Sequence, residues 1–187
     1  EARAAGGPAR RRVSRFQIPE LATGRLLLRA FREDDLEAFA AMSADPEVMR
    51  YIGTGDTVDR NAAWRTMAGF NGHWALRGIG MWAVQRLEDS AFIGRAGLHH
   101  PPYWPSLECG WVLSRSAWGH GYAREAAAAA LAYARRARPG ERLQSFIQPG
   151  NDRSVRVALA IGARRAGDAD LLGSPVQVYE HDNPARG

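Results

Sequence analysis

Two glycines separated by one residue, Gly119 and Gly121, stand between an apolar run and a long alanine-rich segment. The run Glu108–Leu113 predicts a strand, and the segment from Tyr122 to Ala137 predicts a helix. The free N–H groups and the positive dipole end of this helix would therefore meet a turn whose glycines let a ligand approach the backbone. Such a turn is suited to binding a diphosphate.

The glycine turn matches neither of two familiar phosphate-binding loops. No Gly-Lys-Ser/Thr follows it, as a Walker loop requires, and Arg124 stands where a Rossmann fingerprint has its third glycine. The order of the preceding segments also differs from a regular strand–helix alternation. The turn therefore predicts an anion site in a mixed α/β domain of another kind.

Apolar periodicity and capping residues predict the remaining elements. Strands are expected at residues 25–31, 81–87, 91–99, 108–113, 142–148, 163–167 and 175–181. Helices are expected from Asp34, from Asp59 to Gly78, from residue 121 or 122 to 137 and from Asn151 to Gly162, with a short turn at 46–51. The predicted order is that of a mixed α/β (α+β) domain whose first part is antiparallel.

The net charge of +5 is concentrated at the start of the chain. Residues 1–15 contain five of the 25 basic residues, all of them arginine, and a single acid, so the remainder is nearly neutral. Because the basic excess is not on the domain, we do not expect a nucleic-acid partner. Residues 1–20 predict a disordered basic tail, and residues 21–187 a single domain.

One cysteine, Cys109, rules out an intramolecular disulfide framework and a cysteine zinc cluster, and it favours a reducing, cytoplasmic setting. The histidines do not complete a recognised metal-ligand spacing, so we expect no metal. No apolar run approaches the roughly 18–20 residues that span a bilayer, and the first residues lack the apolar core of a secretory signal. We therefore expect no membrane partner.

A second polar helix start follows the glycine turn. Asn151-Asp152-Arg153-Ser154 opens the later helix, and asparagine is among the best N-cap residues. A functional role for these side chains requires that the two helices border one cleft.

These motifs, in this order and spacing, resemble the GNAT superfamily of N-acetyltransferases, and most closely its RimJ/RimL branch of ribosomal-protein N-terminal acetyltransferases and their relatives. The residues that carry the resemblance are 108–113, 117–126 and 151–163, together with 25–29 and 34–36 near the start. The resemblance spans about residues 21–181. It implies a GNAT fold, with a central, mostly antiparallel and splayed sheet of about six or seven strands and about four helices.

The resemblance also implies acetyl-CoA as the donor and a primary amine as the acceptor, either a protein N-terminus or a small molecule. Relatives often form homodimers, so a homodimer stays open. In relatives the pantetheine arm enters beside the strand that carries Val112 and Leu113, and the pyrophosphate rests on the turn. The implied CoA-binding residues are Val112, Leu113, Trp118, Gly119, His120, Gly121, Tyr122, Ala123 and Asn151.

A general base is expected, because an aliphatic ammonium near pKa 10.4 must lose a proton before it attacks. Glu108 stands where relatives often carry a carboxylate, and it is a candidate base or water-relay anchor, with a structural ion pair as the alternative. Ala158 stands where many relatives have a tyrosine acid, so Ser154 becomes the candidate partner of the departing thiolate. His99 and Trp104 are candidates for lining the acceptor pocket.

We therefore expect an N-acetyltransferase in which the amine attacks acetyl-CoA directly within a ternary complex. The alternative is a non-catalytic acyl-CoA-binding or protein-interaction module on the same fold. Ala158 favours this alternative, as does Ser116, which stands where the family often has Arg or Gln. The acceptor stays open among protein N-termini, aminoglycoside-like amines, polyamines and amino acids.

Overall fold

An eight-stranded sheet forms the centre of the protein, in the order β1-β2-β3-β4-β5-β6-β8-β7. The computed structural model describes residues 17–185, so most of the predicted basic tail lies outside the described residues. The strands are β1 (Leu21–Ala22), β2 (Leu26–Arg29), β3 (Met81–Arg86), β4 (Phe92–His99), β5 (Leu107–Leu113), β6 (Leu143–Ile147), β7 (Arg164–Leu171) and β8 (Ser174–His181). All neighbours pair antiparallel except β5 and β6, which confirms the expected mixed, mostly antiparallel fold.

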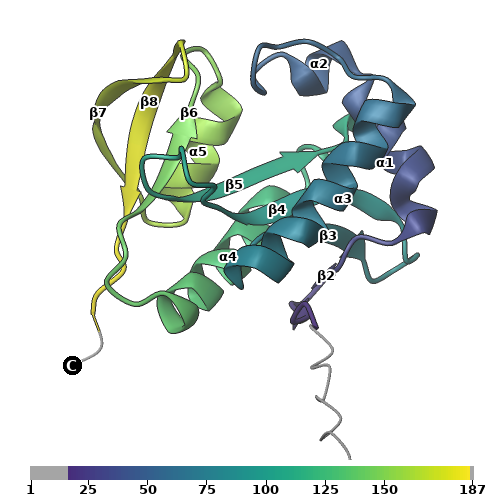
Figure 1. Ribbon diagram of the computed structural model, residues 1–187, viewed down its shortest axis with the longest axis horizontal. Coiled ribbons are helices and arrows are strands. Elements are labelled where there is room, and N and C mark those ends of the chain that lie inside the picture. Colours follow the sequence, from purple (N-terminus) through teal and green to yellow (C-terminus); the bar gives the residue numbers. More distant parts are fainter. Residues whose placement is uncertain (1–16, 186–187) are drawn as a thin grey trace, which may run out of the picture.

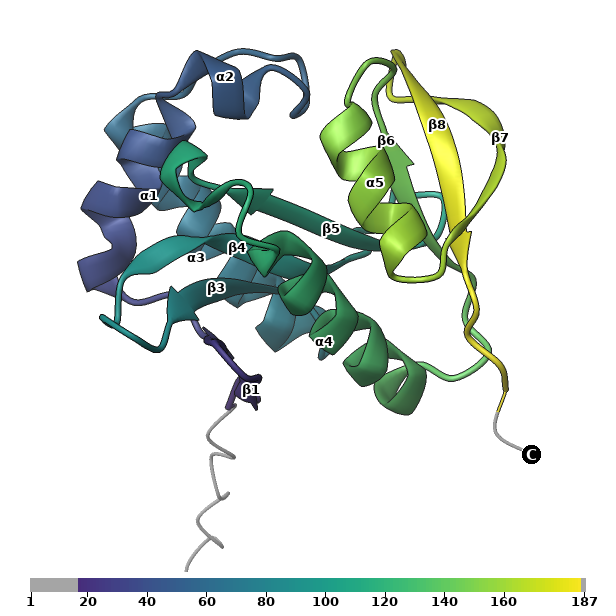
Figure 2. The same ribbon diagram turned by 180° about the vertical axis from the view of Figure 1, so that it is seen from behind.

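Helices cover both faces of this sheet. They are α1 (Leu36–Ser43), α2 (Pro46–Met49), α3 (Arg60–Arg77), α4 (Tyr122–Ala137) and α5 (Asp152–Ala160). Figures 1 and 2 show α3 and α4 on opposite faces of strands β3 to β5. The predicted ends of α3 form as expected: the Asp59 carboxylate accepts a hydrogen bond from the Ala62 amide, and Gly78 adopts the left-handed conformation.

The sheet is slightly larger than the six or seven strands that were expected. Leu21 and Ala22 add a short first strand by pairing with β2. Contacts with the core begin earlier still, since Ile18 packs against it and the Pro19 carbonyl accepts a 2.7 Å hydrogen bond from Trp82 Nε1. At the other end, β7 continues to Leu171, beyond the expected end at residue 167, because its mostly exposed residues give no apolar pattern.

Each face of the sheet carries its own hydrophobic cluster. On one face, the small residues Ala126, Ala127 and Ala130 of α4 are fully buried and let the helix lie close to β4 and β5. On the other face, α1 and α3 pack over the sheet through aromatic side chains, with Phe31 stacked on Phe70 at 5.4 Å between ring centroids. The alternation along β5 sends Cys109 to the first face and Val112 to the second.

β5 and β6 are paired only at their first residues. Two parallel register pairs join them, Leu107 with Leu143 and Glu108 with Gln144. Beyond this point β5 stays paired with β4, whereas β6 continues its pairing with β8. The two strands therefore diverge, and the expected splayed sheet forms. In both Figure 1 and Figure 2, β6, β7, β8 and α5 stand together on one side, and α2 faces α5 across the opening.

Side chains replace strand pairing where the sheet opens. The carbonyl of Cys109, the first residue of β5 beyond the last pair, accepts a 2.5 Å hydrogen bond from the Ser145 hydroxyl. Ser145 and its other partner, His181 Nε2 at 2.9 Å, are both buried. A buried carbonyl without a partner is costly, so this contact stabilises the divergence of the strands.

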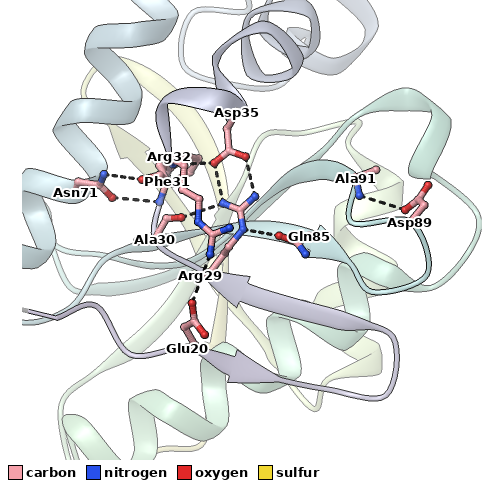
Figure 3. Close-up of polar contacts among 10 residues, drawn as sticks. All are labelled: Glu20, Arg29, Ala30, Phe31, Arg32, Asp35, Asn71, Gln85, Asp89 and Ala91. Carbon is pink, nitrogen blue, oxygen red and sulfur yellow. Dashed lines mark hydrogen bonds and ion pairs between the residues drawn. The ribbon is translucent and has the colours of Figure 1, made fainter.

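A buried ion pair joins the first strand to the first helices (Figure 3). The guanidinium of Arg29 donates from both terminal nitrogens to the Asp35 carboxylate at 2.7 Å, and from Nε to Gln85 Oε1 at 2.6 Å. Asp35 also accepts from the Arg32 amide at 2.8 Å. The pair therefore links β2, β3 and the start of α1, with every charge matched by hydrogen bonds.

Replacing Asp35 with asparagine tests this link. The variant leaves the buried Arg29 charge without a counter-charge, so we expect the free energy of unfolding to fall by about 3–5 kcal/mol. Urea denaturation measures this change. The matched control is Glu37→Gln, which breaks the exposed pair with Arg60, where the Glu37 side chain is 75% exposed, and should change stability little. Equal losses in the two variants would contradict the structural role of the buried pair.

Candidate functional site

A cavity of about 1150 Å³ lies at the opening between β5 and β6. It is bordered by β5, by the turn before α4, by the start of α5 and by the segment that follows α2. The predicted CoA-binding residues that line it are Val112, Leu113, Trp118, Gly119, Gly121, Tyr122, Ala123 and Asn151. Ser154 lines it as well, whereas His120 does not and is exposed beside Tyr122. The structure thus brings the two polar helix starts to one cleft.

The glycine turn adopts a backbone that favours glycine. Gly119 has φ of +82° and Gly121 has φ of +79°, both in the left-handed region. Gly121 is the N-cap residue of α4, so the first-turn amides that follow it have no carbonyl partner within the helix. Trp118 Nε1 donates a 2.9 Å hydrogen bond to the Leu113 carbonyl and ties the turn to the end of β5. The result is a fixed cluster of N–H donors at the cavity wall.

Glu125 holds the turn against the first strands. Its carboxylate accepts from Arg25 Nε at 2.8 Å, from the Arg25 amide at 2.9 Å and from the Thr23 hydroxyl at 2.6 Å. Arg25 Nη1 in turn donates to the His120 carbonyl at 2.9 Å. The sequence did not indicate this positioning role, because a carboxylate in the first turn is favourable in any helix.

Two polar side chains at the start of α5 have different roles: Asn151 caps the helix, and Ser154 presents its hydroxyl to the cavity. Asn151 Oδ1 accepts from the Ser154 amide at 3.3 Å, which confirms the predicted N-cap. The Ser154 hydroxyl has no hydrogen-bond partner among residues 17–185, and it remains available to a ligand. Ala158, one turn further on, is fully buried against β6 and β8, so its position offers no acid to the cavity.

Glu108 lies at the apex of the opening, in the last register pair between β5 and β6. Its Oε2 accepts a 2.8 Å hydrogen bond from Trp104 Nε1. Burial raises the pKa of Glu108 to about 7, although Trp104, the charge of Arg95 and the Phe146 amide favour the carboxylate. The group can therefore exchange a proton near neutral pH.

His99 stands opposite Glu108 in the β4–β5 register, on the same face of the sheet. Its ring makes an edge contact with Trp104 at 4.9 Å and stacks on His73 at 5.4 Å. Burial lowers the pKa of His99 to about 4, so the ring is neutral at pH 7. Glu108, His99 and Trp104, predicted separately, thus form one cluster, which adjoins the splay but is not part of the cavity wall that holds Ser154.

Two parts of the site carried no sequence signal. Arg50, Tyr51 and Ile52, which follow α2, form the cavity wall opposite α5, and Gln148 Nε2 bridges to this segment by a 2.7 Å hydrogen bond to the Gly53 carbonyl. Arg95 of β4 lies on the same face as Glu108. Only the tertiary structure brings these distant residues together.

Within residues 17–185, no three His, Cys, Asp or Glu side chains gather closely enough to hold a metal ion. In the same part of the chain, no helix combines the length and the apolar character needed to cross a membrane.

Comparisons with known proteins agree with this geometry. A family model described as an acetyltransferase (GNAT) domain matches residues 25–164. The chain is 32% identical over 147 residues to YnaD, an uncharacterized N-acetyltransferase of Bacillus subtilis, covering 79% of the chain and 84% of that protein. The crystal structure of an acetyltransferase from Agrobacterium tumefaciens superposes with a TM-score of 0.77 at 31% identity, covering 89% of this chain and 96% of that one.

A more distant structure shares the fold. RimL, a ribosomal L7/L12 α-N-protein acetyltransferase solved in complex with coenzyme A, superposes with a TM-score of 0.72 at 17% identity, covering 88% of this chain and 97% of that one. At this identity the likeness concerns the fold alone.

The raised pKa of Glu108 predicts a pH-dependent stability. Between its ordinary value of 4.5 and about 7, the folded protein holds a proton that the unfolded chain has released, so the free energy of unfolding falls as the pH rises. Glu108→Gln does not titrate, and it should gain up to about 3 kcal/mol over the wild type across this window.

Urea denaturation between pH 4.5 and 8 measures the difference between the two proteins. Glu37→Gln, at a side chain that is 75% exposed, is the control and should follow the wild type at each pH. A stability difference for Glu108→Gln that stayed constant with pH would show that Glu108 titrates normally.

Proposed function

The chain belongs to the GNAT acetyltransferase family, and from that premise we propose that it transfers an acetyl group from acetyl-CoA to the nitrogen of a primary amine. The observation that carries the proposal is the cavity at the splay of β5 and β6, which joins the glycine turn, the start of α5 and the end of β5. Glu108, with a pKa of about 7, is in the last register pair before the strands diverge, beside the cavity but not in its wall.

The residues of the cavity suit coenzyme A. The unpartnered first-turn amides of α4 and the left-handed Gly119 and Gly121 offer a backbone cradle for a diphosphate. Cationic side chains around it supply further positive charge; those lining the cavity are Arg50, Arg115, Arg124, Arg153 and Arg156. Arg153 lies over the Trp118 ring at 4.1 Å, whereas Arg115 is paired with Asp45 at 3.1 Å.

Acetyl-CoA would supply the acetyl group as a thioester, so that the amine nitrogen bonds to the carbonyl carbon and the C–S bond breaks. The departing thiolate would leave as the CoA thiol by taking the second proton that the nitrogen loses on forming the amide. The Glu108 carboxylate takes the proton that the ammonium must lose, directly or through a water molecule. Beyond Glu108, β5 has no β6 partner, and the backbone N–H of Leu113, whose carbonyl faces the turn before α4, is suited to the oxygen on which negative charge develops. Direct attack then depends largely on how the chain orients the two substrates.

Ser154 is the proposed partner of the leaving sulfur. Its hydroxyl lines the cavity and has no hydrogen-bond partner among the described residues. A CoA thiol resembles cysteine in acidity, near pKa 8.5, so a neutral hydrogen bond suffices to assist its departure. This role fits the absence of a tyrosine at Ala158.

The second candidate is a module that binds acyl-CoA or a protein without turnover, and the buried Ala158 favours it. It predicts CoA binding without thiol release on any amine.

A cytoplasmic location and a homodimer stay predictions from the sequence and the family resemblance.

Gly121→Val tests the CoA cradle. A β-branched side chain at φ of +79° forces the turn out of its conformation, and its Cβ would stand 3.5 Å from Arg25 Nη2. We expect the Kd for CoA, measured by calorimetry, to rise at least about 100-fold, equivalent to about 2.7 kcal/mol. The control is Gly173→Val, at a left-handed glycine of φ +84° with open space around its Cβ, which should leave CoA affinity intact. Unchanged affinity in Gly121→Val would place CoA elsewhere.

The pH dependence of turnover tests Glu108. With both substrates saturating, kcat should rise as Glu108 loses its proton around pH 7, and Glu108→Gln should lose this step together with about 100-fold or more of the plateau rate. Trp104→Phe removes a hydrogen bond that lowers the pKa of Glu108, so the step should move to higher pH by roughly one unit or less. A step that stays in place in Glu108→Gln would assign the base to another group.

A further inference from the structure

Arg95 is a half-buried arginine on the central strand β4, on the face of the sheet that α3 covers. Its guanidinium forms no hydrogen bond and no ion pair with any residue between 17 and 185. Its one ring contact is with Phe70 of α3, whose centroid lies 5.0 Å from Cζ. Burial lowers the pKa of Arg95 to about 10, so the group is still charged at neutral pH.

Arg29 shows how this chain satisfies a buried arginine that is structural. The Arg29 guanidinium meets both oxygens of Asp35 at 2.7 Å and Gln85 at 2.6 Å (Figure 3). Arg95 has only the longer-range charge of Glu108 in its favour. A desolvated guanidinium without acceptors is costly, and its planar fork of donors matches a carboxylate. The open donors of Arg95 therefore call for an anion that residues 17–185 do not provide.

The β4–β5 register puts Arg95 and the proposed base on one face. Arg95 is opposite Val112, and His99 is opposite Glu108, while the row between them pairs Gly97 with Gly110. These two rows are separated by four residues along the strand, or about 13 Å between Cα atoms. The side chains reach toward each other across this span, since the charges of Arg95 and Glu108 act on each other.

The glycine row between Arg95 and Glu108 adds no side chain of its own to this face of the sheet. Neighbouring groups lie close to this row: a Cβ on Gly110 would lie 3.2 Å from the Met81 methyl group, and a Cβ on Gly97 would lie 2.5 Å from the Gly80 carbonyl oxygen. Val112, beside Arg95, is also part of the cavity wall. Arg95, the glycine row and Glu108 thus follow one another as a strip along one face of the sheet.

We propose that Arg95 binds a carboxylate of the acceptor, so that the amine acetylated by this protein is an amino acid or another small amine that carries a carboxylate. The inference rests on the proposed function, because it places the acceptor nitrogen toward Glu108. A polyamine or an aminoglycoside would bring further positive charge to Arg95, and a protein N-terminus has its first carboxyl group in a peptide bond. The strip therefore selects a small zwitterion among the acceptors that the sequence left open.

A matched acceptor series tests the proposal. The common L-amino acids are first screened by acetyl-CoA-dependent thiol release, beside spermidine, an aminoglycoside and a short peptide with an acidic first residue. The best amino acid is then compared with its carboxamide and with its decarboxylated amine. We expect the wild type to prefer the carboxylate form by roughly 10- to 100-fold in kcat/KM, mainly through KM.

Arg95→Gln should abolish this preference, because it lowers kcat/KM for the amino acid and leaves kcat/KM for the carboxamide and the amine unchanged. Arg95→Lys should retain part of the preference. CoA affinity, measured by calorimetry, should be unchanged in both variants and thus reports their folding. If Arg95 served only to keep Glu108 charged, Arg95→Gln would raise the pH of the kcat step equally for the amino acid and its amide. That result, or a wild-type preference for spermidine, the aminoglycoside or the peptide, would overturn the proposal.

The two proposals fail in different ways. If no amine is acetylated although CoA binds, the proposed function fails. Calorimetry of the same amino acids with the CoA-bound protein then decides the carboxylate site: binding that Arg95→Gln removes supports it, and binding that is absent or unaffected overturns it.

Discussion

The early divergence of β5 from β6 is the constraint on which the rest of the site depends. After two parallel pairs, β5 keeps its pairing with β4 and β6 keeps its pairing with β8, so the sheet opens at Cys109. Buried backbone groups tolerate such an opening only when other partners replace the lost strand, and the Ser145 hydroxyl does so for the Cys109 carbonyl. The cavity, the free edge of β5 and the position of Glu108 all follow from this one interruption.

The buried charges of the molecule divide into satisfied and open groups. Arg29 and Asp35 match each other's hydrogen bonds completely and serve to join β2, β3 and α1. Glu108 and Arg95, on the face covered by α3, are desolvated and form no ion pair within residues 17–185, and burial shifts their pKa values toward the neutral forms. Strongly shifted pKa values and unmatched donors are typical of functional sites, and this is why we propose both residues for the acceptor side of the site.

Local signals predicted the elements well wherever they did not depend on distant partners. Asp59 and Gly78 bound α3 as expected, Asn151 caps α5, and Gly119 and Gly121 adopt the left-handed backbone that a tight turn before a helix requires. The extent of β7 was not predictable, because its polar, exposed residues carry no apolar alternation and it is formed by pairing with β8. The two-residue strand β1 was not predictable for the same reason, because it forms by pairing with the edge of β2.

By itself, the sequence determined the family, the glycine turn and the polar start of α5, because their spacing along the chain is local and chemically specific. Only the tertiary structure decided what these parts do together. Glu125 clamps the turn through Arg25, a contact across 100 residues. Glu108 acquires a pKa of about 7 because β4, β5 and the Trp104 loop bury it. Arg95 has no ion-pair partner among residues 17–185, because the glycine row separates it from Glu108, whose charge acts only at longer range. Burial and charge matching arise from packing between distant segments, and a linear pattern does not contain them.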